Sequence, residues 1–356
     1  MKKILFDLDM GKWALFFYPI MKELKKRDIS FVVTSRGGEG YNELNEILDL
    51  YKIDYISIGE YGGSSLEGKL KASIDRQLKL IDIINKHNID TIISGSVVDA
   101  TRVGFGLGKR VINFYDMPIK DYKTNLKKAL PQIKLTIPLS SKVFKPFVVP
   151  DEVYLRLGLE KDQIVEYNFI DPMIWLKDFK FDEYYVKKFY KKYGIDRSKF
   201  SILVREEEYK ASYVRKKYPF LYEVLPEIYK KFNANVIIIP RYESNYLKKE
   251  FPFAFIIEEK IILQHLLKDV DLFIGGGGTI NSEACFLGTP TISTRSFISH
   301  YDKWQIDNGL MVWANNKNKL IKYVGMAKNG LLKPNLKALE KMEVNLNTIV
   351  NEILKG

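Results

Sequence analysis

The chain has 356 residues, of which 46% are hydrophobic and 28% charged, a composition that excludes a disordered protein and allows two domains. No run approaches about 18 uncharged apolar residues, so no transmembrane helix is expected. The single cysteine, Cys285, excludes an internal disulfide and indicates a reducing cytoplasm.

The net charge is +12, and most of the surplus lies in residues 179–356, which hold 29 basic and 20 acidic residues. A basic half suits an anionic ligand such as a nucleotide diphosphate, or an anionic membrane surface. Ordinary solvated lysine-rich helices explain the surplus equally well. Nucleic acid is not an expected partner, because no recognisable nucleic-acid-binding pattern accompanies the charge.

Short apolar runs alternate with helical patterns through the first half of the chain. The predicted strands are 4–8, 30–34, 55–58, 90–94 and 110–114, and the predicted helices are 14–26, 41–51, 66–87 and 100–107. The longest helix rests on apolar residues at Leu70, Ile74, Leu78, Ile81 and Ile84. This rhythm predicts an α/β fold with a doubly wound parallel sheet.

A proline-rich and less periodic segment, 131–172, is predicted to end the first domain and supply a linker. The rhythm then resumes with helices at 181–193 and 221–232, strands at 201–205, 235–240, 254–257, 272–274 and 291–293, and a last helix at 336–354. We therefore predict a GT-B-type fold of two Rossmann-like domains facing a cleft. The first spans 1–172, with the linker at 138–172, and would bind an acceptor; the second spans 173–334 and would bind a nucleotide sugar. Residues 335–356 are predicted to form a C-terminal helix that packs back toward the first domain.

The most informative segment is 269–290, which reads DVDLFIGGGGTINSEACFLGTP. A short apolar run leads into Gly275, Gly276, Gly277 and Gly278. Thr279 follows at the expected N-cap position, and a helix is predicted at 281–287. Glycines and free N–H groups at a helix N-terminus favour phosphate, while Asn281 and Glu283 are placed to bind the rest of the donor, with the Glu283 carboxylate accepting from sugar hydroxyls.

The same glycines could form only a tight turn between a strand and a helix, without a ligand. The segment is not a Walker A loop, because no Gly-Lys-Ser/Thr follows it. It is also not a dinucleotide fingerprint, because it comes late in the chain and lacks the G-x-G-x-x-G register. A nucleotide-sugar site is the interpretation that we favour.

Further candidates for donor binding lie near predicted strand ends in the second half. Arg205 and Arg241 could bind a diphosphate through their guanidinium groups, or could instead pair with neighbouring glutamates. Arg295 is a weaker candidate of the same kind. Lys210 and Tyr213 could close over the nucleotide or belong to a solvated loop.

The first domain offers an acceptor loop and three carboxylates. Gly62, Gly63, Ser64 and Ser65 precede a helix and could bind an acceptor through backbone N–H groups, or could be a simple connection. Asp116, Asp99 and Asp9 each follow a predicted strand and are candidates for a general base. We favour Asp116 over Asp99, which is also a natural N-cap, and Asp9 is the third candidate.

Six segments together resemble the archaeal domain-of-unknown-function 354 family: FFYPI at 16–20, YGGSSLEGKL at 61–70, RVGFGLG at 102–108, KASY at 210–213, PRYE at 240–243 and the glycine segment at 275–290. This family is itself related to non-hydrolysing UDP-GlcNAc 2-epimerases and to the UDP-GlcNAc transferase of peptidoglycan synthesis. The resemblance implies a GT-B fold and nucleotide-sugar chemistry, but it supplies no reaction.

The chain departs from the family at two places where a histidine is usual, MGKWAL at 10–15 and DMPIK at 116–120. Of its three histidines, His87 is expected to end a helix and His265 to be structural. His300 is the one that could reach a cleft. The missing histidines count against an epimerase-like mechanism.

These observations predict a cytoplasmic glycosyltransferase that moves a sugar from a nucleotide-diphosphate donor, with UDP expected, to a glycan or lipid-linked acceptor. No metal or other cofactor is expected, because the helix N-terminus and arginines would stabilise the leaving diphosphate. A nucleotide-sugar 2-epimerase or hydrolase, and a non-catalytic sugar-nucleotide-binding protein, remain open. The mixed basic and apolar segment 122–145 suits peripheral contact with the inner face of a membrane, but equally an ordinary helix and strand.

Overall fold

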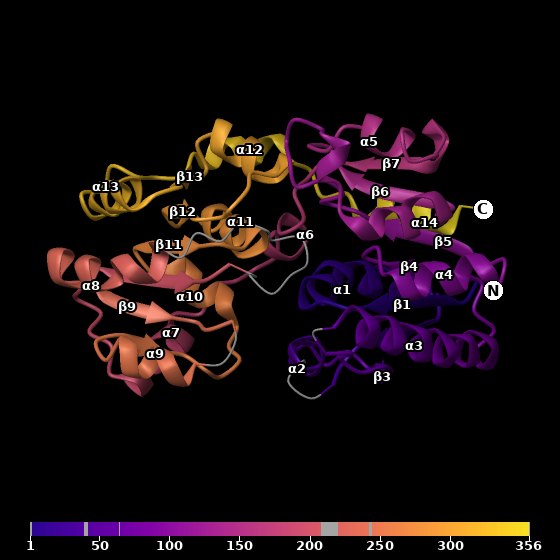
Figure 1. Cartoon of the computed structure of the whole chain (residues 1–356), viewed down its shortest axis with the longest axis horizontal. Helices are drawn as coiled ribbons and strands as arrows, with labels where there is room; N and C mark the ends of the chain where they lie inside the picture. Colours follow the sequence, from indigo (N-terminus) through magenta and orange to yellow (C-terminus); the bar gives the residue numbers. More distant parts are fainter. Residues whose placement is uncertain (1, 39–41, 64, 208–219, 242–243, 356) are drawn as a thin grey trace. The chain divides into compact units, whose positions relative to one another are not determined.

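The computed structural model describes residues 2–38, 42–63, 65–207, 220–241 and 244–355. The chain divides into unit 1, which comprises Met1–Trp175 and Glu343–Gly356, and unit 2, which comprises Leu176–Met342. Each unit contains a parallel sheet with helices packed against it (Figure 1). The predicted fold class, two Rossmann-like parallel-sheet domains, is therefore confirmed.

The sheet of unit 1 has seven strands in the order β3-β2-β1-β4-β5-β6-β7. They are β1 (Ile4–Leu8), β2 (Phe31–Ser35), β3 (Ile56–Ser57), β4 (Thr91–Ser94), β5 (Arg110–Phe114), β6 (Lys142–Pro146) and β7 (Ile164–Tyr167). The helices are α1 (Gly11–Lys26), α2 (Glu43–Leu50), α3 (Leu66–Lys86), α4 (Val98–Gly106), α5 (Glu152–Leu155) and α14 (Leu346–Leu354). The chain leaves unit 1 within α6 (Met173–Leu176).

Aromatic side chains fill the space between α1 and the sheet of unit 1. The ring centroids of Phe16 and Phe17 lie 5.3 and 5.1 Å from that of Phe114 on β5, and β1 is buried along its whole length. Large rings bury much apolar area in few residues. This cluster holds α1 against the carboxyl halves of the central strands.

Residues 138–172, predicted to be a linker, instead add β6 and β7 to this sheet, where they pair in parallel with β5 and with each other. The prediction failed because charged residues interrupt the apolar pattern of β6. Lys145 is nevertheless buried, since its ammonium pairs with Asp151 at 2.9 Å and also with Glu166. A buried cation is tolerated when it is paired in this way.

The sheet of unit 2 has six strands in the order β10-β9-β8-β11-β12-β13. They are β8 (Ser201–Arg205), β9 (Asn235–Ile238), β10 (Phe255–Ile256), β11 (Leu272–Gly275), β12 (Thr291–Ser293) and β13 (Val312–Trp313). The helices are α7 (Glu183–Tyr193), α8 (Phe220–Phe232), α9 (Asn245–Glu250), α10 (Leu263–Asp269), α11 (Gly278–Phe286), α12 (His300–Asp307) and α13 (Lys317–Lys328).

The last predicted helix, 336–354, is wrong as a single element. Leu336–Lys341 forms a 3-10 helix in unit 2, and α14 is a separate helix in unit 1. The side chain of Asn345 accepts a hydrogen bond from the Thr348 amide at 3.0 Å and so starts α14 anew. Within unit 1, α14 packs on α1.

Candidate functional site

In each sheet, the strand order has one position, the reversal point, where the chain stops adding strands on one side of the first strand and begins to add them on the other side. In unit 2, β9 and β10 lie on one side of β8, whereas β12 and β13 continue on the far side of β11. In unit 1, β1 and β4 hold the corresponding positions. Doubly wound sheets bind ligands at the carboxyl ends of such a strand pair. The residues that follow β8, β11, β1 and β4 are therefore the candidates.

In unit 2 the helix N-terminus at this position is that of α11. β11 ends at Gly275, Gly277 is the N-cap with extended backbone, and α11 begins at Gly278. The prediction that Thr279 caps the helix is wrong, because Thr279 lies in its first turn. N–H groups of a first turn have no partner within the helix, and the helix dipole adds positive potential there. This end of α11 is thus suited to an anion.

Two of the four glycines are required by packing. A Cβ on Gly275 would lie 2.3 Å from Oδ1 of Asn281, and a Cβ on Gly276 would lie 2.5 Å from Cβ of Glu207. Side chains at these positions would displace the turn. Gly275 and Gly276 are therefore explained by close packing in the turn, which is the alternative to ligand binding that the sequence left open.

Gly277 and Gly278 border the helix N-terminus itself. A Cβ on Gly277 would meet no described atom within 4 Å, whereas a Cβ on Gly278 would lie 2.7 Å from Nη1 of Arg295. The Arg295 guanidinium donates a hydrogen bond of 2.7 Å to Asp302 and lies 4.1 Å from the ring centroid of Phe297. These contacts hold a positive charge beside the first turn of α11, where both would attract the same anion.

Arg205 and Arg241 lie at the carboxyl side of β8 and β9. Arg205 is the last residue of β8 and pairs in register with Gly275 of β11. The charges of both arginines act on Glu206, which also accepts a hydrogen bond from the Arg241 backbone. Burial raises the pKa of Glu206, and these contacts oppose the increase. Both arginines therefore act electrostatically on an acidic neighbour.

Sequence reasoning missed Glu207 and ranked Arg295 below Arg205 and Arg241. Glu207 accepts hydrogen bonds from the Ser296 hydroxyl at 2.8 Å and the Ser296 amide at 3.2 Å, and burial raises its pKa. Arg295 and Ser296 come two and three residues after the end of β12, the neighbour of β11. The order of the strands is the signal that would have found them.

Asn281 and Glu283 lie on α11 and follow its N-terminus along the chain. Glu283 is 3% exposed, and its Oε1 accepts a hydrogen bond of 2.6 Å from Gln264. Asn281 is completely buried, and within the described parts of the chain neither polar atom of its amide has a hydrogen-bond partner. Their roles as donor-binding residues stay predictions.

In unit 1, Asp9 directly follows β1 at the reversal point. Its Oδ2 lies 4.0 Å from Nη2 of Arg36, and its buried Oδ1 has no hydrogen-bond partner among the residues described. Burial raises the pKa of Asp9, against the lowering effect of Arg36 and Arg76. Trp13 on α1 lies at the same edge, since a Cβ on Gly95, just after β4, would fall 1.8 Å from its ring.

Asp99 belongs to a buried ionic network. Arg76 on α3 donates to both oxygens of Asp7, at 3.0 and 2.5 Å, and its Nη1 lies 3.5 Å from Asp99. Asp99 also accepts a hydrogen bond from Ser73. It lies in the first turn of α4, whose N-cap is Val97, so the suggestion that Asp99 caps this helix is wrong. These bonds leave Asp99 less suited than Asp9 to take up a proton.

Asp116 follows β5 and is bound to Lys12, a residue that sequence reasoning did not single out. The Lys12 ammonium lies 2.5 Å from Asp116 and 2.6 Å from the fully buried Asp171, and it is 4.3 Å from the Trp13 ring. Burial lowers the pKa of Lys12, but the two carboxylates outweigh this effect and the pKa is raised. Asp116 is therefore one member of a charged triad.

The proposed acceptor loop packs on the start of α3. A Cβ on Gly62 would lie 2.4 Å from the Gly68 carbonyl oxygen, and the Ser65 hydroxyl caps α3 by accepting from the Gly68 amide at 3.0 Å. Gly63 has a φ of +77°, which favours glycine. Ser64, like Lys210 and Tyr213, lies outside the described residues.

His87 and His265 occupy structural positions, whereas the prediction that His300 could reach a cleft stays a prediction. His87 is the C-cap of α3, as expected. His265 accepts a hydrogen bond of 3.1 Å from the Asp182 amide among aromatic rings, and burial lowers its pKa. His300 is the buried first residue of α12.

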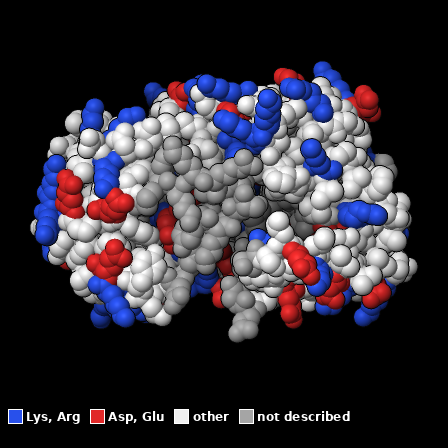
Figure 2. Space-filling view, viewed as in Figure 1, with Lys and Arg blue, Asp and Glu red and all other residues white. Residues whose placement is uncertain are grey.

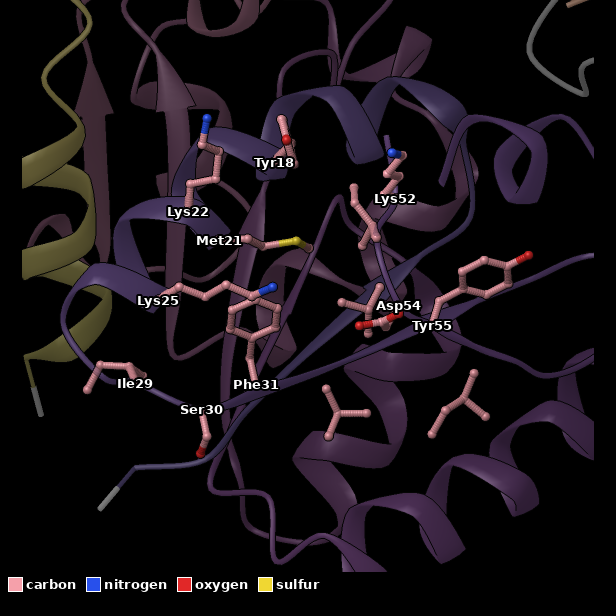
Figure 3. Close-up of a pocket in the computed structure, with 14 residues that line it drawn as sticks. Tyr18, Met21, Lys22, Lys25, Ile29, Ser30, Phe31, Lys52, Asp54 and Tyr55 are labelled. Atoms are coloured by element: carbon pink, nitrogen blue, oxygen red, sulfur yellow. The ribbon is translucent and has the colours of Figure 1, made fainter. Parts of the chain in front are cut away.

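A separate groove of about 450 Å³ lies along the amino-terminal halves of β2 and β3 in unit 1. Tyr18, Lys22 and Lys25 of α1 line it together with Phe31 and Tyr55 (Figure 3). It is at the opposite end of the strands from Asp9. On the face of the molecule in Figure 2, basic and acidic side chains are interspersed over both units, which accords with an ordinary solvated surface. Within the described segments, no helix is long and apolar enough to cross a membrane.

Two doubly wound parallel sheets on one chain define the GT-B type of fold, and comparisons with solved structures agree. UDP-GlcNAc 2-epimerase from Neisseria meningitidis, bound to UDP-GlcNAc, superposes with a TM-score of 0.75 at 17% identity, over 99% of this chain and 100% of that one. The Methanocaldococcus jannaschii UDP-GlcNAc 2-epimerase, in complex with UDP-GlcNAc and UDP, gives a TM-score of 0.74 at 19% identity, also over 99% of this chain and 100% of that one. A spinosyn rhamnosyltransferase gives 0.58 at 12%, over 99% of each chain.

The family model described as "Protein of unknown function (DUF354)" matches residues 2–354, so the chain belongs to this family. An uncharacterized protein of Methanocaldococcus jannaschii is 26% identical over 325 residues, which cover 89% of each chain. The predicted family is thereby confirmed.

Proposed function

We propose that this chain is an enzyme that acts on a nucleotide-diphosphate sugar, with the diphosphate bound in unit 2 at the N-terminus of α11. The observation that carries the proposal is the position of Arg295 beside Gly278, next to Gly277, where an added Cβ would meet no atom of the described residues within 4 Å. We propose UDP as the nucleotide, because the solved epimerases with this fold are described with UDP or UDP-GlcNAc. Glu283 would accept hydrogen bonds from the ribose or sugar hydroxyls.

The reaction that we propose is glycosyl transfer. An acceptor hydroxyl gives its proton to a carboxylate and attacks the anomeric carbon, and the bond from that carbon to the diphosphate oxygen breaks. The diphosphate leaves with the electron pair, stabilised by the helix N-terminus and Arg295, so that the proposal requires no metal. Asp9 is the best candidate for the base, because burial raises its pKa and its Oδ1 has no hydrogen-bond partner among the described residues. Asp99 and Asp116, in contrast, are bonded to Arg76 and Lys12.

A nucleotide-sugar 2-epimerase is the second candidate, supported by the two epimerases that share the fold over nearly the whole chain. A lipid-linked acceptor is not included in the proposal. Much of the apolar side of segment 122–145, including Leu130, Ile133 and Ile137, is buried inside unit 1 rather than available to a membrane.

Calorimetric titration with UDP, UDP-GlcNAc, GDP-mannose and ADP-glucose tests the binding step. Arg295→Gln should weaken binding of the preferred nucleotide by about 10- to 100-fold. Gly277→Ser should also weaken it, because the new side chain enters the ligand space while serine remains a good N-cap. Gly325→Ser on α13 is the matched control and should leave affinity unchanged. If the folded wild type binds none of the four, the proposal fails.

Turnover then separates the reactions. A transferase releases UDP only when an acceptor is present, a hydrolase releases it without one, and an epimerase converts the donor alone into a second nucleotide sugar. Asp9→Asn should abolish turnover but leave nucleotide affinity unchanged, since Asp9 belongs to unit 1. Binding without product under every condition would identify a non-catalytic sugar-nucleotide-binding protein.

A further inference from the structure

The long helix α3 exposes a continuous apolar stripe. Leu66, Leu70, Ile74 and Leu78 recur every four residues and are 84%, 62%, 51% and 61% exposed. Residues at this spacing lie on one face of a helix. The opposite side of α3 is buried and carries Arg76, with Leu80, Ile83 and Ile84. The stripe is therefore not needed for the core of unit 1.

A row of charges runs beside this stripe. Glu67 and Lys71 pair at 2.6 Å, and Asp75 and Lys79 pair at 2.6 Å, so the signs alternate along the helix. In a helix of opposite direction the order of these residues is reversed, so that Lys79 takes the place of Glu67 and Asp75 takes the place of Lys71. When a second, antiparallel α3 lies against the stripe, each charge therefore faces one of opposite sign.

We propose that the stripe on α3 is an interface with a second copy of this chain, in which two α3 helices pack antiparallel about a twofold axis. Leu66 then faces Leu78 of the other copy, and Leu70 faces Ile74. Isologous contacts require this self-complementarity, in which residue i meets j and j meets i. The charged row has no net charge, which favours a second copy over an anionic membrane.

The expected size of the interface sets its strength. With 21 residues, α3 is about 31 Å long, and a strip about 11 Å wide gives about 350 Å² per copy. A standard interface buries about 800 Å² per partner. The adjoining helix α4 packs on α3 (Figure 1). Phe105 in its last turn and Leu107 at its C-cap are exposed and can supply part of the difference. The interface is thus at the small end of the range, and we expect a micromolar dissociation constant.

Sedimentation of the full chain from about 1 to about 200 µM tests the proposal, with a dimer of twice the 41.4 kDa chain mass as the expected result. The double variant Leu70→Glu/Ile74→Glu should raise the dissociation constant about 100-fold or more. Leu331→Glu is the control, because Leu331 is also a highly exposed leucine, at 70%, but lies in unit 2. Circular dichroism confirms that the variants are folded.

Charge reversal distinguishes this arrangement from any other use of the stripe. Lys79→Glu should weaken the dimer about 3- to 10-fold, because it faces Glu67 of the other copy. Glu67→Lys/Lys79→Glu should recover most of the loss. Both variants contain like-charged i,i+4 neighbours within α3, so only a contact between copies explains recovery. A monomeric wild type over the whole range, a dimer that survives the stripe variant, or a swap without recovery would each overturn the proposal.

Discussion

Replacing Arg76 with methionine should destabilise unit 1 by about 3–5 kcal/mol. The Arg76 side chain is 1% exposed and bonds both oxygens of Asp7, which is fully buried. Methionine retains much of the side-chain volume but leaves the Asp7 carboxylate without its counter-charge. At about 3 Å and an effective dielectric constant of about 20, the lost attraction is about 5.5 kcal/mol, close to the upper end of the expected loss.

Urea unfolding at neutral pH, followed by circular dichroism, measures this loss, and hydrogen exchange should localise it to β1, β4 and α3. Combining Arg76→Met with Asp7→Asn should cost less than the sum of the two single variants by about 2 kcal/mol, because residue 7 then carries no unpaired charge. Arg156→Met is the control in the same unit, since the exposed pair that Arg156 forms with Glu152 contributes less than about 0.5 kcal/mol. A loss below about 1 kcal/mol for Arg76→Met, or strict additivity, would refute the reasoning.

Three further outcomes follow from single residues. Lys12→Met should destabilise the protein by about 3 kcal/mol, because the buried Asp171 carboxylate loses the cation that pairs with it. Since the pKa of Lys12 is raised, the stability of the wild type should also fall as the pH rises from the ordinary lysine pKa through the raised one. Equal pH profiles of stability for the wild type and the variant in alkaline urea titrations would contradict this. Asp9→Asn should be neutral or slightly stabilising at neutral pH, since ionising an aspartate of raised pKa costs stability as the pH rises from its unfolded to its folded value; a clear loss in thermal unfolding would argue against it. Cys285 should react with a thiol reagent only after denaturation, because it is buried and burial raises its pKa. Rapid labelling of the native protein would show that solvent reaches Cys285.

The elements that sequence analysis placed well are those set by local patterns. The strand 201–205 has the bounds that the apolar run predicts, and the glycine turn lies between a strand and a helix as expected. Local patterns failed where a distant partner changes the outcome. Lys145 can lie inside β6 only because Asp151 and Glu166 neutralise it, and neither partner is visible in the pattern of the strand itself.

The candidate site was only partly predictable for the same reason. The glycines, the arginines at strand ends and Asp9 were found because each follows an apolar run. The rank order changed once partners were known: Asp99 and Asp116 are held by Arg76 and Lys12, whereas Asp9 keeps an oxygen without a partner among the described residues. Partners of this kind come from other elements, so their distance along the chain hides them.

The sequence by itself determined two series of alternating strands and helices and a glycine turn at the start of a helix, because hydrophobic periodicity and glycine act over a few residues. The tertiary structure decided the order of the strands, and with it which turns lie at a reversal point of each sheet. It also decided that Arg295 lies beside Gly278 and that Arg76, rather than Leu70 or Leu78 of α3, faces the core. These outcomes depend on contacts between residues far apart in the chain, and such contacts exist only after the sheets have formed and the helices have packed against them.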